Sequence, residues 1–145
     1  MPSLTEEDLN GLCKDILYID NSIRFIGIAN NLGSLVATAY RNGLTPLMDK
    51  QETSHYAILA VLRAATREDF ESKIGSLEYS IGKYKRLIRA TIQITLFGKE
   101  DESKFYYLLL SFGNSNVLDV IENKIMPFIR KNKESRLKHL DSNDT

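Results

Sequence analysis

The densest group of residues able to do chemistry lies between positions 83 and 89. Four cations occupy this segment around Tyr84: Lys83, Lys85, Arg86 and Arg89. Cationic side chains hold phosphate groups by charge, and an aromatic ring among them can stack on a base. The segment is therefore a candidate anion-binding site. The alternative is a solvated turn whose cations pair with Glu78 or with acidic residues near the N-terminus.

The overall charge argues against nucleic acid as the partner. The chain holds 19 basic and 19 acidic residues, which leaves a formal net charge of zero, whereas nucleic-acid-binding domains usually carry an excess of basic groups. The charges are nevertheless unevenly placed, because five acids and one base lie in the first 20 residues. This separation favours a protein that assembles with another protein.

Two isolated residues could do other chemistry, and neither has the neighbours it would need. Cys13 lies on the apolar stripe of an expected helix, where a cysteine is usually an inert packing group. His55 has Asp49 and Glu52 nearby, but no second histidine or nucleophile at a useful spacing. Phosphate-binding glycine loops, hydrolase motifs and metal-ligand spacings are absent from the sequence. We therefore predict no catalysis, no cofactor and no metal.

Length and composition indicate one ordinary globular domain. The chain has 145 residues, 43% of them hydrophobic and 26% charged, enough to bury a core without disulfides. The single cysteine favours a reducing cytoplasm. The N-terminus is acidic and polar, unlike a secretory signal, and no lipidation signal is present. No apolar run approaches the roughly 18 residues that span a bilayer.

The first half of the chain predicts a helix, a hairpin and a second helix. Apolar residues recur at helical spacing over residues 5–20, after a capping box of Ser3 with Glu6. Residues 23–29 and 35–40 are short β-branched runs around a glycine turn, which indicates a β-hairpin. Thr45 and Pro46 predict the start of a helix over residues 46–65. Its expected inward stripe comprises Leu47, Ile58, Val61, Leu62 and Ala65.

The second half predicts a three-strand meander and a last helix. Residues 74–81 and 86–97 alternate in polarity, and residues 104–112 are apolar on both faces, as a central strand must be. In the second of these strands Arg89 and Thr91 are expected to face outward. The last helix carries a stripe of Val117, Leu118, Ile121, Ile125, Phe128 and Ile129. Pro127 should kink it near Met126.

Together these elements predict one α/β (α+β) domain in the order α-β-β-α-β-β-β-α. Its strands form a single five-stranded antiparallel sheet whose apolar side the helices cover. The domain is expected to span residues 1–130, and residues 131–145 are expected to form a polar, frayed tail.

This order and the segment Asn31-Leu32-Gly33-Ser34-Leu35-Val36-Ala37 resemble the roadblock / dynein light chain family, within the profilin-like and longin-like group. The resemblance covers nearly the whole chain. The segment from Lys73-Ile74-Gly75 through Tyr79-Ser80 to Lys85-Arg86 also resembles a family of small archaeal proteins. Roadblock-like proteins are non-enzymatic homodimers that regulate small GTPases or scaffold complexes. The resemblance implies such a regulatory role here, with a small GTPase or signalling complex as partner.

The same resemblance implies a homodimer that pairs the central helix and the third strand of each subunit. On the helix, one face is too apolar for solvent: Tyr56, Leu59, Ala60 and Arg63. On the strand, the outward residues are Ser76, Glu78 and Ser80, and the strand lacks the lysine or proline that usually protects an edge. The alternative is that the helix face packs under the link of residues 66–72.

A PAS-like small-ligand sensor is the second reading of the fold. Such a sensor requires an interior cavity of roughly 300 Å³ or more, whereas a scaffold has a filled core. Small residues on the hairpin, among them Gly27 and Ala37, leave room for either.

Overall fold

The computed structural model describes residues 5–67, 70–97, 103–113 and 116–131, and the predicted tail lies outside them except for residue 131. The predicted order of elements is confirmed, with one short helix added between the central helix and the third strand. The elements are α1 (Glu6–Leu17), β1 (Ile23–Asn30), β2 (Leu35–Tyr40), α2 (Lys50–Arg67), α3 (Glu71–Ile74), β3 (Tyr79–Lys83), β4 (Ile88–Phe97), β5 (Ser103–Phe112), α4 (Val117–Val120) and the π-helical segment η2 (Ile121–Ile125).

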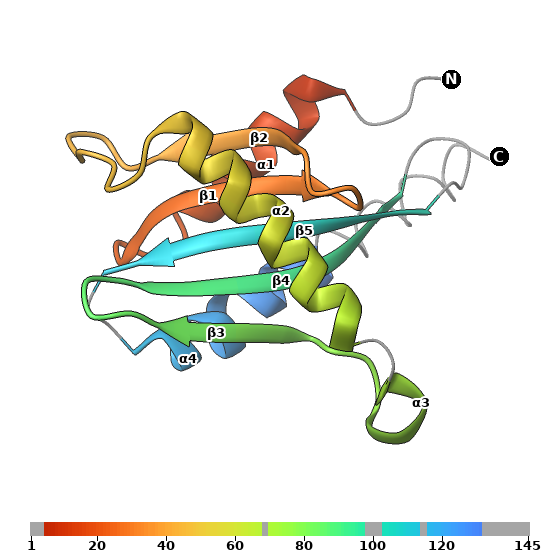
Figure 1. Ribbon diagram of the computed structural model, residues 1–145. Coiled ribbons are helices and arrows are strands. Elements are labelled where there is room, and N and C mark those ends of the chain that lie inside the picture. Colours follow the sequence, from red (N-terminus) through yellow and green to blue (C-terminus); the bar gives the residue numbers. More distant parts are fainter. Residues whose placement is uncertain (1–4, 68–69, 98–102, 114–115, 132–145) are drawn as a thin grey trace, which may run out of the picture.

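The five strands form one antiparallel sheet in the order β2-β1-β5-β4-β3. β5 lies at the centre, as its apolar sequence predicts, and β3 lies at one edge (Figure 1). Leu108 of β5 pairs with Ile28 of β1 on one side and with Ile92 of β4 on the other. The last strand in the sequence therefore joins the first hairpin to the β3–β4 pair.

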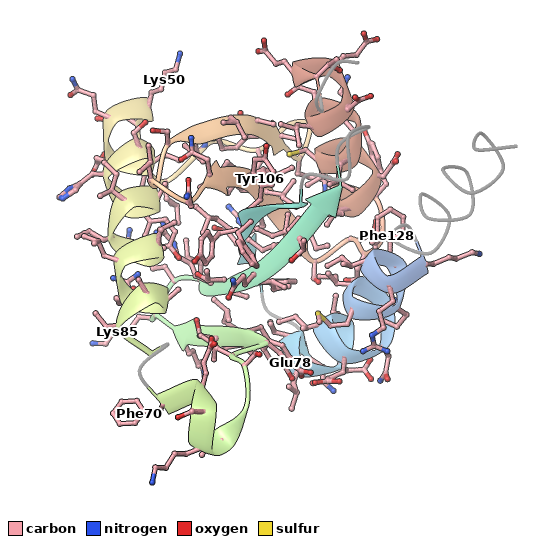
Figure 2. The ribbon with its side chains drawn as sticks, turned by 90° about the vertical axis from the view of Figure 1, so that its right-hand side faces the viewer. Lys50, Phe70, Glu78, Lys85, Tyr106 and Phe128 are labelled. Carbon is pink, nitrogen blue, oxygen red and sulfur yellow. The ribbon has the colours of Figure 1, made fainter. Side chains whose placement is uncertain are left out.

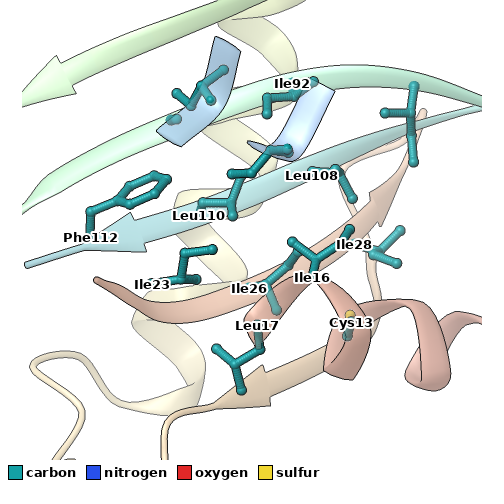
Figure 3. Packing of buried hydrophobic residues seen from close by; sticks show 14 of the residues in the cluster. Cys13, Ile16, Leu17, Ile23, Ile26, Ile28, Ile92, Leu108, Leu110 and Phe112 are labelled. Carbon is teal, nitrogen blue, oxygen red and sulfur yellow. The ribbon is translucent and has the colours of Figure 1, made fainter. Parts of the chain in front are cut away.

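Helices cover both faces of the sheet, whereas the sequence predicted one covered side. α1, α4 and η2 pack on one face and enclose the larger core, which includes Ile16, Ile26, Leu108 and Ile121 (Figure 3). α2 crosses the other face and forms a second, smaller core with Tyr107 and Leu109. Figure 2 shows this three-layer arrangement from the side. The polar side of β4 is consequently covered by α2, and Arg89 and Thr91 are half-buried.

Both long helices begin with a capping box, each at a position other than the predicted one. Thr5 caps α1: the backbone N–H of Asp8 donates to Thr5 Oγ1 at 3.0 Å, and Asp8 Oδ2 accepts from the Thr5 N–H. The predicted Ser3 lies outside the described residues. α2 begins at Lys50 because Asp49 and Glu52 exchange the same two bonds, at 2.8 and 3.1 Å. Thr45 and Pro46 belong to the preceding loop.

The predicted inward stripe of α2 is mostly wrong. The residues that face the sheet are small: Thr53, Ala57, Ala60, Val61 and Ala64. Leu47, Ile58, Leu62 and Ala65 are exposed, so only Val61 of the predicted stripe is buried. Small side chains let the helix approach the sheet closely. The β1–β2 turn also approaches it, because a Cβ on Gly33, which has φ +86°, would lie 2.8 Å from Ile58 Cα.

β3 is shorter than predicted. The strand begins at Tyr79, while Glu71–Ile74 forms α3, so Ser76 and Glu78 precede the strand. Gly75 ends α3 with φ +90° and donates its N–H to the carbonyl of Glu71 at 2.9 Å. Residues 74–78 alternate in polarity as a strand does, but they lie before β3, because Gly75 separates this segment from the sheet.

The final helix contains the irregularity that Pro127 predicts, in the form of a π-helical turn. η2 occupies residues Ile121–Ile125, immediately before Met126. Proline cannot donate a backbone hydrogen bond, and a π-turn is a common way to accommodate such an interruption. Val120 replaces Leu118 in the buried stripe, and Leu118 is exposed.

Arg41 holds the end of β2 against the end of α1. Its guanidinium Nη2 donates to the carbonyls of Leu17 at 2.6 Å, Asp20 at 2.8 Å and Ile23 at 2.9 Å. The same group lies 5.7 Å from the ring centroid of Tyr18. One side chain therefore satisfies carbonyls at the C-terminal end of α1 and in the turn that follows it.

Replacing this side chain should destabilise the fold. We expect Arg41→Met to lower the free energy of unfolding by about 2 kcal/mol, because hydrogen bonds from a charged donor are lost and partly buried carbonyls remain. Urea unfolding followed by circular dichroism measures this. The control is Arg86→Met, which removes an exposed arginine on the β3–β4 turn. Equal stability of the two variants would contradict the role of Arg41.

An ion pair joins the same turn to the final helix. Lys124 Nζ lies 2.7 Å from Asp20 Oδ1, and Ser22 donates from its backbone and side chain to Asp20 Oδ2. The bonds from Lys124 and Ser22 lower the pKa of Asp20 to about 2. Since the carboxylate is favoured in the folded state, its contribution to stability is present above the unfolded pKa and is lost as the pH falls.

Acid titration should expose this contribution. Wild type and Asp20→Asn should differ in stability by about 1 kcal/mol or less near neutral pH, as is usual for ion pairs at the protein surface. The difference should shrink as the pH falls from about 4.5 and should vanish only below about pH 2, where Asp20 is protonated in both the unfolded and the folded state. Thermal melts across this range measure it, and a difference that is independent of pH would contradict the assignment.

Candidate functional site: the β3 edge and the recess beside it

β3 presents an outer edge that no strand covers in the described part of the chain. The edge carries no proline, but it ends at Lys83, so the prediction that this strand lacks a lysine is wrong for the strand as it forms. Ile81 in its middle is 41% exposed. Ser80 is half-buried and pairs with Thr91 of β4. Glu78 is exposed immediately before the strand. An unpaired strand edge of this kind can take another strand.

The flank of α2 nearest to β3 contains the helix residues predicted for an interface, but not all of them are accessible. Leu59 and Arg63 are exposed, Tyr56 is half-buried, and Ala60 is buried against the sheet. Leu62, which the sequence placed in the core, is 56% exposed and extends the apolar surface. Together with Ile58 these leucines form the outer apolar face of α2.

A recess lies between α2 and the β3–β4 pair. Its walls combine members of both predicted groups: Tyr56, Ala60 and Arg63 from α2, Ser80, Ile81, Gly82 and Tyr84 from β3 and its turn, and Arg89 and Thr91 from β4. The structure therefore places Arg89, predicted as an anion-binding residue, beside Tyr56 and Arg63, predicted as interface residues.

Arg89 is the centre of this recess. Its guanidinium carbon lies 3.8 Å from the ring centroid of Tyr56 and 5.9 Å from that of Tyr84. The guanidinium carbon of Arg63 lies 5.9 Å from the centroid of the same Tyr56 ring, so two positive charges lie beside one aromatic ring. Among the described residues, Arg89 donates a side-chain hydrogen bond only to the Met48 sulfur, at 3.0 Å, and neither arginine forms an ion pair.

The remaining predicted cations do not converge on the recess. Lys83 is opposite Ile88, which packs against the α1 side of the sheet, so Lys83 lies on the face away from α2. Lys85 and Arg86 are exposed on the turn, and Lys85 is labelled in Figure 2. None of the three forms an ion pair within the part of the chain that the structure describes, including with Glu78. The four-cation segment is therefore split, with Arg89 alone entering the recess.

Sequence spacing offered no signal for the Tyr56–Arg89 contact. The two residues are far apart in the chain, and the alternation of β4 placed Arg89 on a solvated side. What the alternation could not show is that α2 covers that side. One local feature of the sequence does agree with the contact: α2 has small residues toward the sheet and a tyrosine at its flank.

The isolated candidates stand away from this recess. Cys13 is fully buried in the α1 core, where burial raises the pKa of its thiol to about 12. Such a thiol is protonated and poorly nucleophilic at neutral pH. His55 is exposed on α2. Across the described residues, no group of three or more histidine, cysteine or acidic residues could hold a metal ion.

Two pockets between α2 and the sheet are small. The recess encloses about 100 Å³, and a neighbouring pocket near Arg24, Leu47 and Met48 encloses about 50 Å³. Both are below the roughly 300 Å³ of a typical small-ligand site. Their size disfavours the ligand-sensor reading at this face.

Within the described residues, none of the helices has the length and apolar character needed to cross a bilayer.

The arrangement of elements is similar to that of several solved structures. MglB from Myxococcus xanthus aligns with 98% of this chain and 94% of its own, with a TM-score of 0.61 and 15% identity. Gliding protein MglB from Thermus thermophilus aligns over 78% and 76%, with a TM-score of 0.59 and 13% identity. A roadblock/LC7 domain from Streptomyces avermitilis aligns over 72% and 78%, with a TM-score of 0.53 and 11% identity.

These similarities show that the chain has a roadblock/LC7-like fold, which confirms the fold predicted from the sequence. No protein-family model matches the sequence, and no curated protein matches it.

Proposed function

We propose that this protein is a non-enzymatic regulatory or scaffolding module that acts as a homodimer and binds a protein partner. The observation that carries the proposal is the unpaired edge of β3 beside the flank of α2 that lines the recess, with the exposed Leu59 and Leu62 on the outer side of the same helix. These two elements are adjacent in space, so a second copy can cover both at once.

Burial of the two surfaces would supply the driving force. Ile58, Leu59 and Leu62 are large apolar side chains that remain in solvent in the single chain. Their burial against the same residues of a second copy removes apolar area from water, and pairing of the β3 edges satisfies backbone groups. A two-fold symmetric contact uses the same patch on both subunits. Self-association of a similar fold supports this, since a further similar structure is described as MglB with a tetrameric arrangement.

A small GTPase, or a signalling complex that contains one, is the partner we propose. This part rests on the resemblance to roadblock proteins. The small pockets between α2 and the sheet give no observation in favour of a ligand sensor.

Sedimentation velocity tests the dimer directly. At micromolar concentration the wild type should sediment at twice the monomer mass of 16.5 kDa. Leu62→Glu should shift the population to monomer, because it places charge in the apolar contact. Leu118→Glu is the matched control: Leu118 is 54% exposed, close to the 56% of Leu62, but lies on α4 across the sheet. A wild type that sediments only as monomer would overturn the proposal.

Capture from a native extract tests the partner. Tagged wild-type protein should retain a protein that photo-crosslinks to a labelled GTP analogue, and an unrelated tagged protein should not. If the dimer is present but nothing that binds GTP is retained, the GTPase assignment is wrong and the dimer is unaffected.

A further inference from the structure

The recess beside β3 gathers positive charge around an aromatic ring. Arg63 and Arg89 both line it, and their guanidinium carbons lie 5.9 Å and 3.8 Å from the centroid of the Tyr56 ring. No acidic side chain lines this recess among the described residues. Two like charges in a space that is partly shielded from water repel each other, and an anion between them offsets that repulsion. The recess therefore favours a negatively charged group.

Arg89 is held in a way that suits anion binding. Its guanidinium lies over the Tyr56 ring, and the Tyr84 ring is 5.9 Å away. Contact with a ring engages the flat face of a guanidinium, whereas its five N–H donors point outward along the edge. Within the described residues, one of these donors goes to the Met48 sulfur, which is a weak acceptor. The half-buried cation thus keeps strong donors for an oxyanion.

The other walls of the recess add donors to this cation. Arg63 is exposed on α2, so its long side chain is free to turn toward a group in the recess. Ser80 and Thr91 pair across β3 and β4 and line the same space. Hydroxyl groups donate hydrogen bonds to phosphate oxygens, as arginine does.

Gly82 keeps the space beside Arg89 open. The two residues are opposite each other in the β3–β4 pairing, so a side chain at position 82 would project next to Arg89. The backbone does not require glycine here: φ is not positive, and an added Cβ would meet only the Tyr84 ring, at an ordinary contact distance of 3.6 Å. Glycine weakens a strand and often marks a close approach by a ligand. We therefore attribute Gly82 to the space that it leaves.

Size and charge together select the class of ligand. The recess encloses about 100 Å³, which suits a single small oxyanion, whereas drug-sized ligands occupy roughly 300 Å³ or more. Arginine is the residue best matched to the geometry of phosphate and carboxylate groups. A phosphate monoester carries a charge of about −1.5 to −2 at pH 7, which matches two arginines better than the single charge of a carboxylate does.

We propose that the recess binds a phosphate group between Arg89 and Arg63, in the space that Gly82 leaves open. Lys83, Lys85 and Arg86 take no part, because they do not line the recess. All residues of the site come from one chain, so the inference goes beyond the proposed homodimer and does not depend on it.

An NMR titration of the full-length protein with inorganic phosphate, at an ionic strength kept constant with sodium chloride, tests the site. The amide signals of Ser80, Gly82 and Arg89 should shift in a saturable way and give a dissociation constant. Arg63→Gln and Arg89→Gln should each weaken binding by about 10-fold or more, because each removes charge-assisted hydrogen bonds. Gly82→Val removes no charge and should weaken binding by a similar factor, because it fills the space beside Arg89.

The controls separate the recess from the general charge of the turn. Lys83→Val places the same side chain one residue further along, on the opposite face, and also removes a cation. Arg86→Gln removes an exposed arginine from the turn. Both should leave the dissociation constant unchanged. If Arg89→Gln does not fold by circular dichroism, Gly82→Val and Arg63→Gln at exposed positions remain, and valine is a good strand former.

The outcomes also distinguish this inference from the proposed function. Absence of saturable shifts in wild type would overturn the site, and so would a dissociation constant that is the same in Gly82→Val, or one that rises equally in Lys83→Val. Tighter binding of O-phosphoserine than of inorganic phosphate would support a site for a phosphate monoester, and weaker binding would support one for free phosphate. A monomeric wild type in sedimentation would overturn the homodimer and leave the phosphate site intact.

Discussion

Burial of β5 on both faces is the constraint on which the rest of the structure depends. Leu108, Leu110 and Phe112 point to one side of the sheet, and Tyr107 and Leu109 point to the other. A strand that is apolar on both faces must be covered on both faces. One covering layer is built from both ends of the chain, α1 and α4, and the other is α2 alone. The three-layer form follows from this single strand.

The two layers differ in how they pack, and the difference shapes the surface. α1 and the final helix bring isoleucine and leucine to the larger core. α2 brings mainly alanine, so it lies close to the sheet and keeps its large apolar residues outward. The same close approach brings Tyr56 onto Arg89. The apolar outer face of α2 and the contact of Tyr56 with Arg89 in the recess thus both follow from the small side chains on the sheet-facing side of α2.

The net charge of zero conceals a local imbalance that supports the proposed association. Arg63 and Arg89 lie together without a carboxylate among the described residues, while Glu78 is exposed one position before the edge strand. Within one subunit these charges remain apart. A protein with little net charge repels its own copies weakly.

The sequence by itself determined the kind and order of the elements, the β1–β2 hairpin, the inward face of β4 and the central place of β5. These follow from local periodicity and from turn residues, which act over a few positions. Only the tertiary structure decided which face of α2 is buried, that β3 begins at Tyr79, and that Arg89 meets Tyr56. The sequence of α2 predicts that its leucine and isoleucine residues face the core, because they are more hydrophobic than its alanines. In the structure the alanines face the sheet, because small side chains allow close packing. Contacts between residues so far apart in the chain depend on how the layers meet, and no spacing within one element records that.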